Sequence, residues 1–175
     1  PARCVAALWL AAAISAAPAA TNSVGNANNA GAGSLRQVIS SSVSGDTIIF
    51  NACLAGQTIV LTNAELLLNK NLIIDAAALS PGVRISGNHS NRVFEVAAGV
   101  VVTLSSLTIQ DGYAPNGTYP ANAGGGILNR GTLTLTNCTV TNNQALQGSG
   151  AGGGGIENSS GTLTVKLTTG SRITG

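Results

Sequence analysis

Six carboxylates are the residues of this sequence with the most potential for acid–base chemistry. They occur singly along the chain, as Asp46, Glu65, Asp75, Glu95, Asp111 and Glu157. Hydrolysis of a glycosidic bond needs a pair of carboxyl groups, and a calcium-assisted elimination needs an acidic cluster with a basic residue nearby. No two of these acids share a short motif, so the sequence favours strand-capping or solvent-facing roles for them.

Basic side chains and an imidazole could complete such a site only through the fold. Asp75 and Asp111 each end a strand-like stretch. Arg84 or Arg92 could approach them from another side. His89 lies in a polar turn, where a solvated loop residue is the simpler interpretation. The sequence has no Ser-His-Asp arrangement and no Cys-x-x-Cys spacing, so we predict no catalytic residue, no metal site and no cofactor.

Composition limits the class of protein and its partners. The chain has 175 residues, enough for one domain, of which 8% are charged and 3% aromatic, with 23 glycines. A chain rich in aliphatic residues and poor in charge folds, and Ser, Thr and Asn facing water favour β-structure with tight turns. The net charge is +2 and no basic run alternates with aromatic residues, so nucleic acid is not an expected partner.

The first twenty residues have the pattern of a secretory signal. Arg3 precedes an apolar run from Val5 to Ile14, and the small residues Ala17 and Ala19 follow. The run is too short for a membrane span of about 20 residues. We therefore predict that residues 1–20 are the remnant of a signal peptide and that residues 21–175 form one β-helix domain.

Two cysteines remain in this mature part. Cys53 and Cys138 lie far apart in the sequence and do not indicate a disulfide framework. We predict two small buried thiols, because free cysteine packs like a small apolar residue. Whether the two pair depends on the fold.

An internal repeat is the strongest feature of the sequence. The segment Gly125–Asn129 returns as Gly154–Asn158, and Gly-Thr-Leu-Thr follows each copy. A looser copy, Val102–Ile109, aligns with Leu133–Val140 at a similar spacing. A period of about 30 residues indicates a solenoid, in which each unit buries its apolar side on its neighbours.

The apolar pattern within each copy specifies the kind of solenoid. Leu133 and Leu135 alternate with threonines, which is the period of a strand with one buried face. We predict an all-β fold, a right-handed parallel β-helix, in which Asn129 and Asn158 occupy a corner with left-handed backbone angles and bond to each other. An antiparallel sandwich is the alternative, since it also has many short strands, but it does not require the repeat.

A short helix is predicted to cover the first turn, whose open edge would otherwise invite association. Three apolar residues have helical spacing: Leu35, Val38 and Ile39. Ser34 is a suitable N-cap and Gln37 would complete a capping box. The helix is expected near residues 34–43 and Gly45 would end it, with the coils starting at about residue 47. No similar segment closes the other end, so we expect the natural protein to continue.

These residues resemble two groups of bacterial surface proteins. Gly33–Ile39 followed by Gly45–Ile48 resembles the N-terminal region of β-helix proteins of the CSLREA type. It departs from that pattern at three positions, Gly33, Gln37 and Val38. The second half is similar to the repeats of polymorphic outer-membrane proteins, whose Gly-Gly-x-Ile and Phe-x-x-Asn elements correspond to Gly125–Leu128 and Val140–Asn143.

Both resemblances imply the pectin-lyase-like β-helix superfold and export to the cell surface. We therefore expect a non-catalytic scaffold or adhesin, secreted or associated with the outer membrane, with no transmembrane span in this chain. Its partners would be cell-surface or extracellular matrix components, or polysaccharide. The alternative implied by the superfold is a polysaccharide lyase or glycoside hydrolase.

Two further features are candidate binding sites. The loops Asp111–Asn122 and Ala145–Gly153 would hold the recognition residues, with Tyr113 and Tyr119 as aromatic contacts. Outward threonines would also stack into columns able to bind a regular surface such as ice. Strand propensity and solubility are the favoured explanation, because Ser105 and Lys166 interrupt the neighbouring columns. One column would contain Thr103, Thr134 and Thr164, and a shorter one Thr132 and Thr162.

Overall fold

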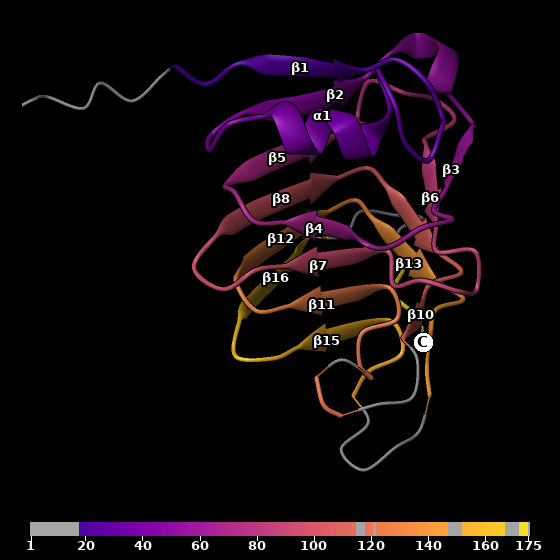
Figure 1. Ribbon diagram of the computed structural model, residues 1–175, viewed down its shortest axis with the longest axis vertical. Coiled ribbons are helices and arrows are strands. Elements are labelled where there is room, and N and C mark those ends of the chain that lie inside the picture. Colours follow the sequence, from indigo (N-terminus) through magenta and orange to yellow (C-terminus); the bar gives the residue numbers. More distant parts are fainter. Residues whose placement is uncertain (1–17, 115–117, 121, 147–151, 167–171, 175) are drawn as a thin grey trace, which may run out of the picture.

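The described part of the chain winds into a parallel β-helix of about five turns (Figure 1). The computed structural model describes residues 18–114, 118–120, 122–146, 152–166 and 172–174. All strand pairs of its four sheets are parallel, which confirms the predicted fold and excludes the antiparallel sandwich. The predicted signal peptide lies almost wholly outside the described residues.

Three sheets form the sides of the solenoid and a small fourth sheet lies at one corner. Sheet A contains β1 (Thr21–Val24), β2 (Thr47–Phe50), β5 (Leu72–Asp75), β8 (Val101–Ser105), β12 (Thr132–Thr136) and β16 (Thr162–Lys166). Sheet B contains β3 (Thr58–Val60), β6 (Arg84–Ser86), β9 (Thr108–Gln110) and β13 (Thr139–Thr141). Sheet C contains β4 (Leu66–Leu68), β7 (Phe94–Val96), β11 (Ile127–Asn129) and β15 (Ile156–Asn158). The fourth, sheet D, pairs β10 (Tyr113–Ala114) with β14 (Gln144–Ala145).

Stacked aliphatic side chains fill the interior. Ile127 pairs in register with Ile156 on one side and Phe94 on the other, so the predicted stack of the repeat is confirmed. Along β12, Leu133 and Leu135 are fully buried and the threonines between them face out. Burial of each such side chain contributes about 1.5 to 3 kcal/mol before entropy is subtracted. The repeat thus stabilises the fold because each turn buries the apolar face of its neighbour.

Left-handed residues turn the chain at two stacked corners. Ser106 and Asn137 occupy the corner from sheet A to sheet B, with φ of 57° and 54°. Asp111 and Asn142 occupy the next corner, with φ of 52° and 53°. Asn and Asp adopt this conformation more readily than most residues because their short polar side chains can bond locally. The corners therefore need polar residues at fixed positions of each turn.

The prediction for the asparagine ladder is half right. Asn129 and Asn158 end strands β11 and β15, so they are not the left-handed corner residues that we expected. Their side chains do pair across the turns, with Asn129 Nδ2 donating to Asn158 Oδ1 at 2.6 Å. Asn129 Oδ1 also accepts from Gly131 N at 3.1 Å, so this buried amide joins two turns to the following bend.

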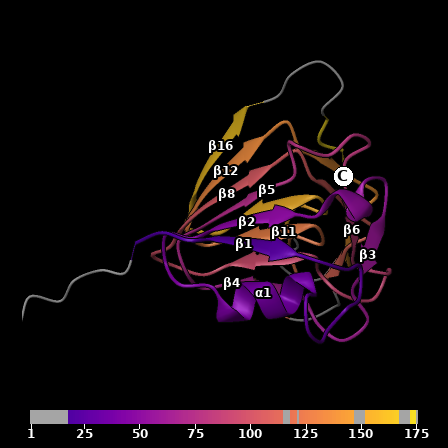
Figure 2. The same ribbon diagram turned by 90° about the horizontal axis from the view of Figure 1, so that it is seen from above.

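Helix α1 (Leu35–Ser41) buries the three predicted apolar residues and lies beside β4 when the solenoid is seen from above (Figure 2). Ser34 Oγ accepts from Gln37 N at 3.2 Å, as an N-cap should. In a capping box the Gln37 side chain would accept from the backbone N–H of Ser34. Here Gln37 Oε1 accepts instead from Gly33 N, at 3.4 Å. Gly45 does not end the helix, which stops at Ser41, but turns the chain into β2 with φ of 100°.

A strand that we did not predict precedes this helix. β1 pairs with β2 from Thr21 to Val24, so sheet A begins before residue 47. Asp46 fixes the pair, since its carboxylate accepts from Ala20 N at 2.8 Å and from Asn22 Nδ2 at 2.8 Å. The first layer is therefore a strand and a helix together, each covering a different side of the solenoid.

Cys53 and Cys138 are both free, and one of them differs from the prediction. Cys138 is buried, and burial raises the pKa of its thiol. Cys53 is exposed, because it lies in η1 (Ala52–Leu54), a short 3-10 helix of which only Leu54 is buried. In the part of the chain that the structure describes, no helix is long and apolar enough to cross a membrane.

Candidate functional site

A polar groove at the corner of sheets B and D is a candidate site. Its volume is about 380 Å3, and residues from separate turns line it: His89, Asn142, Asn143, Gln144 and Thr174. His89 comes from the loop after β6, Asn142 and Asn143 come from the bend between β13 and β14, and Gln144 begins β14. The groove therefore exists only because the solenoid stacks these bends.

Asp111 links the side chains at this corner. Its Oδ2 accepts from Ser86 Oγ at 3.2 Å and from Gln110 Nε2 at 2.7 Å. Its Oδ1 accepts from Asn142 Nδ2 and lies 3.8 Å from His89 Nε2. Three donors hold this carboxylate as an acceptor, so Asp111 positions Asn142 rather than serving as a free acid.

The buried amide of Asn143 fixes the floor of the same bend. Asn143 Oδ1 accepts from Gly112 N at 2.8 Å, and its Nδ2 donates to Ile109 O at 3.1 Å. A Cβ on Gly112 would lie 2.7 Å from Asn143 Oδ1, so the close approach requires glycine. These contacts leave the neighbouring Gln144 exposed at the rim.

Tyr113 lies beside the groove and Tyr119 does not line it. Tyr113 pairs in register with Gln144, so the two side chains leave the same side of sheet D. Tyr119 is 43% exposed and its hydroxyl donates to Glu157 Oε1 at 3.0 Å. Of the two predicted aromatic contacts, only Tyr113 therefore adjoins the polar groove.

A close pair of carboxylates, Glu65 and Glu95, lies on the outer side of sheet C. Arg92 is 6% exposed and its Nη1 donates to Glu65 Oε2 at 2.9 Å and approaches Glu95 Oε2 at 3.5 Å. Its Nη2 donates to Ala123 O at 2.9 Å and its Nε to Gly124 O at 3.0 Å. Arg92 thus attaches the segment before β11 to the two acids of earlier turns.

The two acids of this cluster share the positive charges around them. Burial raises the pKa of Glu65, and the neighbouring Glu95 raises it further, while Arg92 opposes both. Arg130 Nη2 adds a second cation 3.4 Å from Glu95 Oε1. Glu65 and Glu95 are separated by about one repeat of the sequence, and the stacking of β4 and β7 brings them together.

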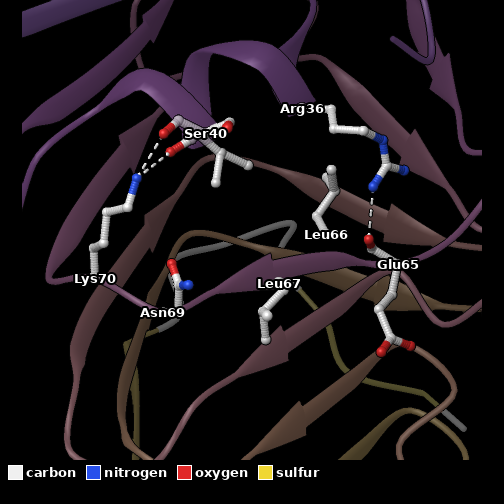
Figure 3. Close-up of a pocket in the computed structure, with 8 residues that line it drawn as sticks. Arg36, Ser40, Glu65, Leu66, Leu67, Asn69 and Lys70 are labelled. Carbon is white, nitrogen blue, oxygen red and sulfur yellow. Dashed lines mark hydrogen bonds between the residues drawn. The ribbon is translucent and has the colours of Figure 1, made fainter.

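A second hollow lies between α1 and β4 (Figure 3). The two basic side chains that line it are bonded to the backbone. Lys70 Nζ donates to the carbonyls of Ser40 and Ser42, both at 2.7 Å, at the end of the helix. Arg36 Nη1 donates to Glu65 O at 2.8 Å from the other side. Because both cations are bonded to main-chain oxygens, they attach α1 to β4 and are not free to bind an anion.

Asp75 and Glu157 each accept a hydrogen bond from a backbone amide. Asp75 Oδ1 accepts from Ala77 N at 2.9 Å at the end of β5. Glu157 Oε2 accepts from Gly153 N at 2.9 Å. Arg84 meets no carboxylate among the described residues and donates to Gly56 O at 2.9 Å. No group of three or more His, Cys, Asp or Glu residues that could hold a metal ion occurs in the described ranges.

The threonine columns lie on the outer face of sheet A. Thr103, Thr134 and Thr164 pair in register, as do Thr132 and Thr162. The longer column continues through Ile73 to Thr47 and Thr21, so it crosses all six strands with one interruption: Thr21, Thr47, Ile73, Thr103, Thr134 and Thr164.

Comparisons with protein-family models, with curated proteins and with solved structures found no match to this chain. They add no support to the resemblance to CSLREA-type or polymorphic outer-membrane proteins. The class that the fold defines is the parallel β-solenoid, and any function has to be argued from its sites.

Proposed function

We propose that this chain is a non-catalytic β-helix scaffold, secreted or displayed on the cell surface, that acts as an adhesin by binding polysaccharide. The observation that carries the proposal is the groove at the corner of sheets B and D. Its lining offers amide, imidazole and hydroxyl groups and no carboxylate among the described residues. Such groups both donate and accept hydrogen bonds, which suits the hydroxyls of an uncharged sugar.

Tyr113 supports a sugar ligand in particular. Its ring lies beside Gln144, so an apolar surface adjoins the hydrogen-bonding groups of the groove. Small-molecule sites combine apolar or aromatic contact area with a few convergent polar groups that fix orientation. A pyranose ring has both kinds of surface, with C–H groups on its faces and hydroxyls at its edge.

Export is part of the proposal and is supported by the sequence. Residues 1–20 have the pattern of a secretory signal, and Gly33–Ile39 resembles exported bacterial β-helix proteins. Expression of the natural gene in a bacterial host, followed by fractionation, tests this part. We expect the protein in the medium or at the surface, and retention in the cytoplasm would contradict export.

A polysaccharide lyase or hydrolase is the second candidate, favoured by the pair of Glu65 and Glu95. Burial raises the pKa of Glu65, as a general acid requires. We favour the scaffold because Arg92 bonds to both acids and to the carbonyls of Ala123 and Gly124 at once. A substrate would have to displace contacts that hold the fold.

Binding of the purified protein to a panel of immobilised neutral and acidic polysaccharides tests the scaffold proposal. We expect binding to at least one neutral polysaccharide, reduced in both Tyr113→Ala and Gln144→Ala. Tyr119→Ala is the matched control, because that ring lies outside the groove lining. Absence of binding, or binding that neither groove variant weakens, would overturn the proposal.

An activity assay distinguishes the second candidate. The protein is incubated with calcium and with pectic and neutral polysaccharides, and new reducing ends and unsaturated products are measured. The scaffold proposal expects no product. Products that disappear in Glu65→Gln, with the variant still folded by circular dichroism, would assign catalysis to the pair on sheet C instead.

A further inference from the structure

The outer face of β8, β12 and β16 is a regular array of hydroxyl groups. Three strands in register present nine outward side chains, of which seven carry a hydroxyl and only one is charged. The array consists of Val101, Thr103, Ser105, Thr132, Thr134, Thr136, Thr162, Thr164 and Lys166. It lies on sheet A, away from the groove at the corner of sheets B and D.

The hydroxyls of this array have no hydrogen-bond partner among the described residues. Elsewhere on the solenoid, polar side chains do bond between turns, as the buried Ser86 does with Asp111 and the buried Asn129 with Asn158. The array therefore keeps its whole hydrogen-bonding capacity for a ligand.

The backbone holds the array in a fixed lattice. β12 is paired on both sides over its whole length, and the leucines below it are fully buried. Neighbouring strands lie about 4.8 Å apart, and alternate residues along a strand about 6.7 Å apart. Branched threonine side chains have few rotamers, so hydroxyl and methyl groups repeat in two dimensions with little freedom.

An uncharged, rigid and periodic face fits a ligand that is itself uncharged and periodic. Lys166 at the border is the single charge, so long-range attraction to an anionic polymer is weak. Apolar surface adjoins the hydroxyls, since Val101 within the array is 52% exposed and Ile73 beside the array is 43% exposed. A solid surface made of regularly spaced hydrogen-bonding oxygens would meet the hydroxyls, while the methyl groups exclude loose water between them.

We infer that this face of β8, β12 and β16 binds the surface of ice. Water ordered between the threonines would continue the lattice of the crystal, because each hydroxyl can both donate and accept a hydrogen bond. A flexible polysaccharide would have to lose conformational entropy to match the same lattice, whereas ice is already ordered. The inference does not depend on the sugar-binding groove.

Thermal hysteresis and adsorption of the fluorescently labelled full chain to a growing ice crystal test this inference. The wild type should shape the crystal and lower its growth temperature. Thr134→Lys, at the centre of the array, should lose the hysteresis and the adsorption. Thr139→Lys is the matched control, because Thr139 faces outward on β13 of sheet B, and it should behave as the wild type.

A second variant separates loss of binding from loss of folding. Thr134→Val keeps the shape and the methyl groups but removes the hydroxyl, and it should reduce the hysteresis without changing the melting temperature in circular dichroism. Absence of hysteresis in the folded wild type would overturn the inference, as would full activity in Thr134→Lys. Dimerisation through this face, or adsorption to crystalline cellulose without adsorption to ice, would also overturn it.

Discussion

The outer faces of sheets A and C use the same stacking in opposite ways. On sheet A the same side chain returns turn after turn, as in Thr103, Thr134 and Thr164, and none of the three hydroxyls has a partner in the described chain. On sheet C the stacked residues change from turn to turn, as Leu67, Glu95, Leu128 and Glu157. On sheet C, Glu95 takes part in ion pairs that connect turns. The repeated threonines of sheet A therefore leave an unpaired surface, whereas the varied side chains of sheet C connect one turn to the next.

Removal of the connecting charge on sheet C should have the largest effect. Arg92→Met leaves Glu65 and Glu95 without their shared cation, and we expect the free energy of unfolding to fall by about 3 to 5 kcal/mol. Urea denaturation followed by circular dichroism measures the loss. The control Arg84→Met removes an arginine that bonds to one carbonyl at the surface and should cost less than about 1 kcal/mol. Equal losses would show that Arg92 does not join the turns.

The inner and outer residues of a single strand sharpen the comparison on sheet A. Leu135→Ala opens a cavity in the stacked core and should lower the free energy of unfolding by about 2 to 5 kcal/mol. Thr134→Ala, one residue earlier, should change it by less than about 0.5 kcal/mol. Denaturation of both variants gives the difference. A large loss for Thr134→Ala would mean that the outer face carries stability of its own.

The pair of Asn129 and Asn158 repeats between turns, as the threonines do, but its side chains bond to each other. Its contribution to the free energy of unfolding can therefore be compared with those of Thr134 and Arg92. Asn129→Ala leaves the buried Gly131 N without its acceptor, so we expect a loss of about 1 to 3 kcal/mol in the free energy of unfolding. Asn158→Ala should cost less, because Asn158 is exposed and Asn129 Nδ2 keeps its bond to Thr162 O. Denaturation of the two variants gives their order, and the reverse order would contradict this assignment.

The smallest effect should be a dependence of stability on pH. Burial raises the pKa of Glu65 above its ordinary value of 4.5, so the folded chain holds this proton more tightly than the unfolded chain. Its contribution to stability is complete below that value and is lost as the pH rises through the raised pKa. Wild type should therefore lose stability relative to Glu65→Gln as the pH rises from 4.5 toward neutral.

Asp46 provides the opposite case in the first layer. Hydrogen bonds from Ala20 N and Val43 N lower the pKa of Asp46 below its ordinary value of 3.8. Its contribution is present above that value and is lost as the pH falls through the lowered pKa. Asp46→Asn should differ most from wild type at neutral pH and least in acid. Thermal melts of wild type and both variants over the same pH range measure the direction of each pH dependence. If the melting temperatures of wild type and Glu65→Gln change in parallel with pH, the prediction for Glu65 is wrong.

The sequence was sufficient for the repeating part of the fold because that part depends on a periodic pattern. Ile127 and Ile156 stack as their spacing predicts, and the threonine columns follow from the same offset. β1 was missed because its single buried residue is Val24, so no apolar alternation marks it. Its pairing with β2 and the bonds to Asp46 make it a strand, and such partners are not visible in a local pattern.

The candidate sites were harder to predict than the core. The sequence marks Tyr113 as an aromatic residue of a loop, but it gives His89 only the pattern of a polar turn and gives Gln144 no signal. They line or adjoin one groove because two bends of different sequence are superposed, with unequal loops between the strands. The cluster of Arg92, Glu65 and Glu95 forms no local motif, and its one signal is that Glu65 and Glu95 lie about one repeat apart.

The near-equal length of the later turns has a consequence for how such a chain can change. Val101, Thr132 and Thr162 occupy the same position of successive turns. Each turn touches only the turn before and the turn after it. Duplication or excision of one complete turn, cut between equivalent residues, would present the same two contact surfaces to its neighbours. The solenoid can thus gain or lose complete turns in evolution while the packing of its core stays the same.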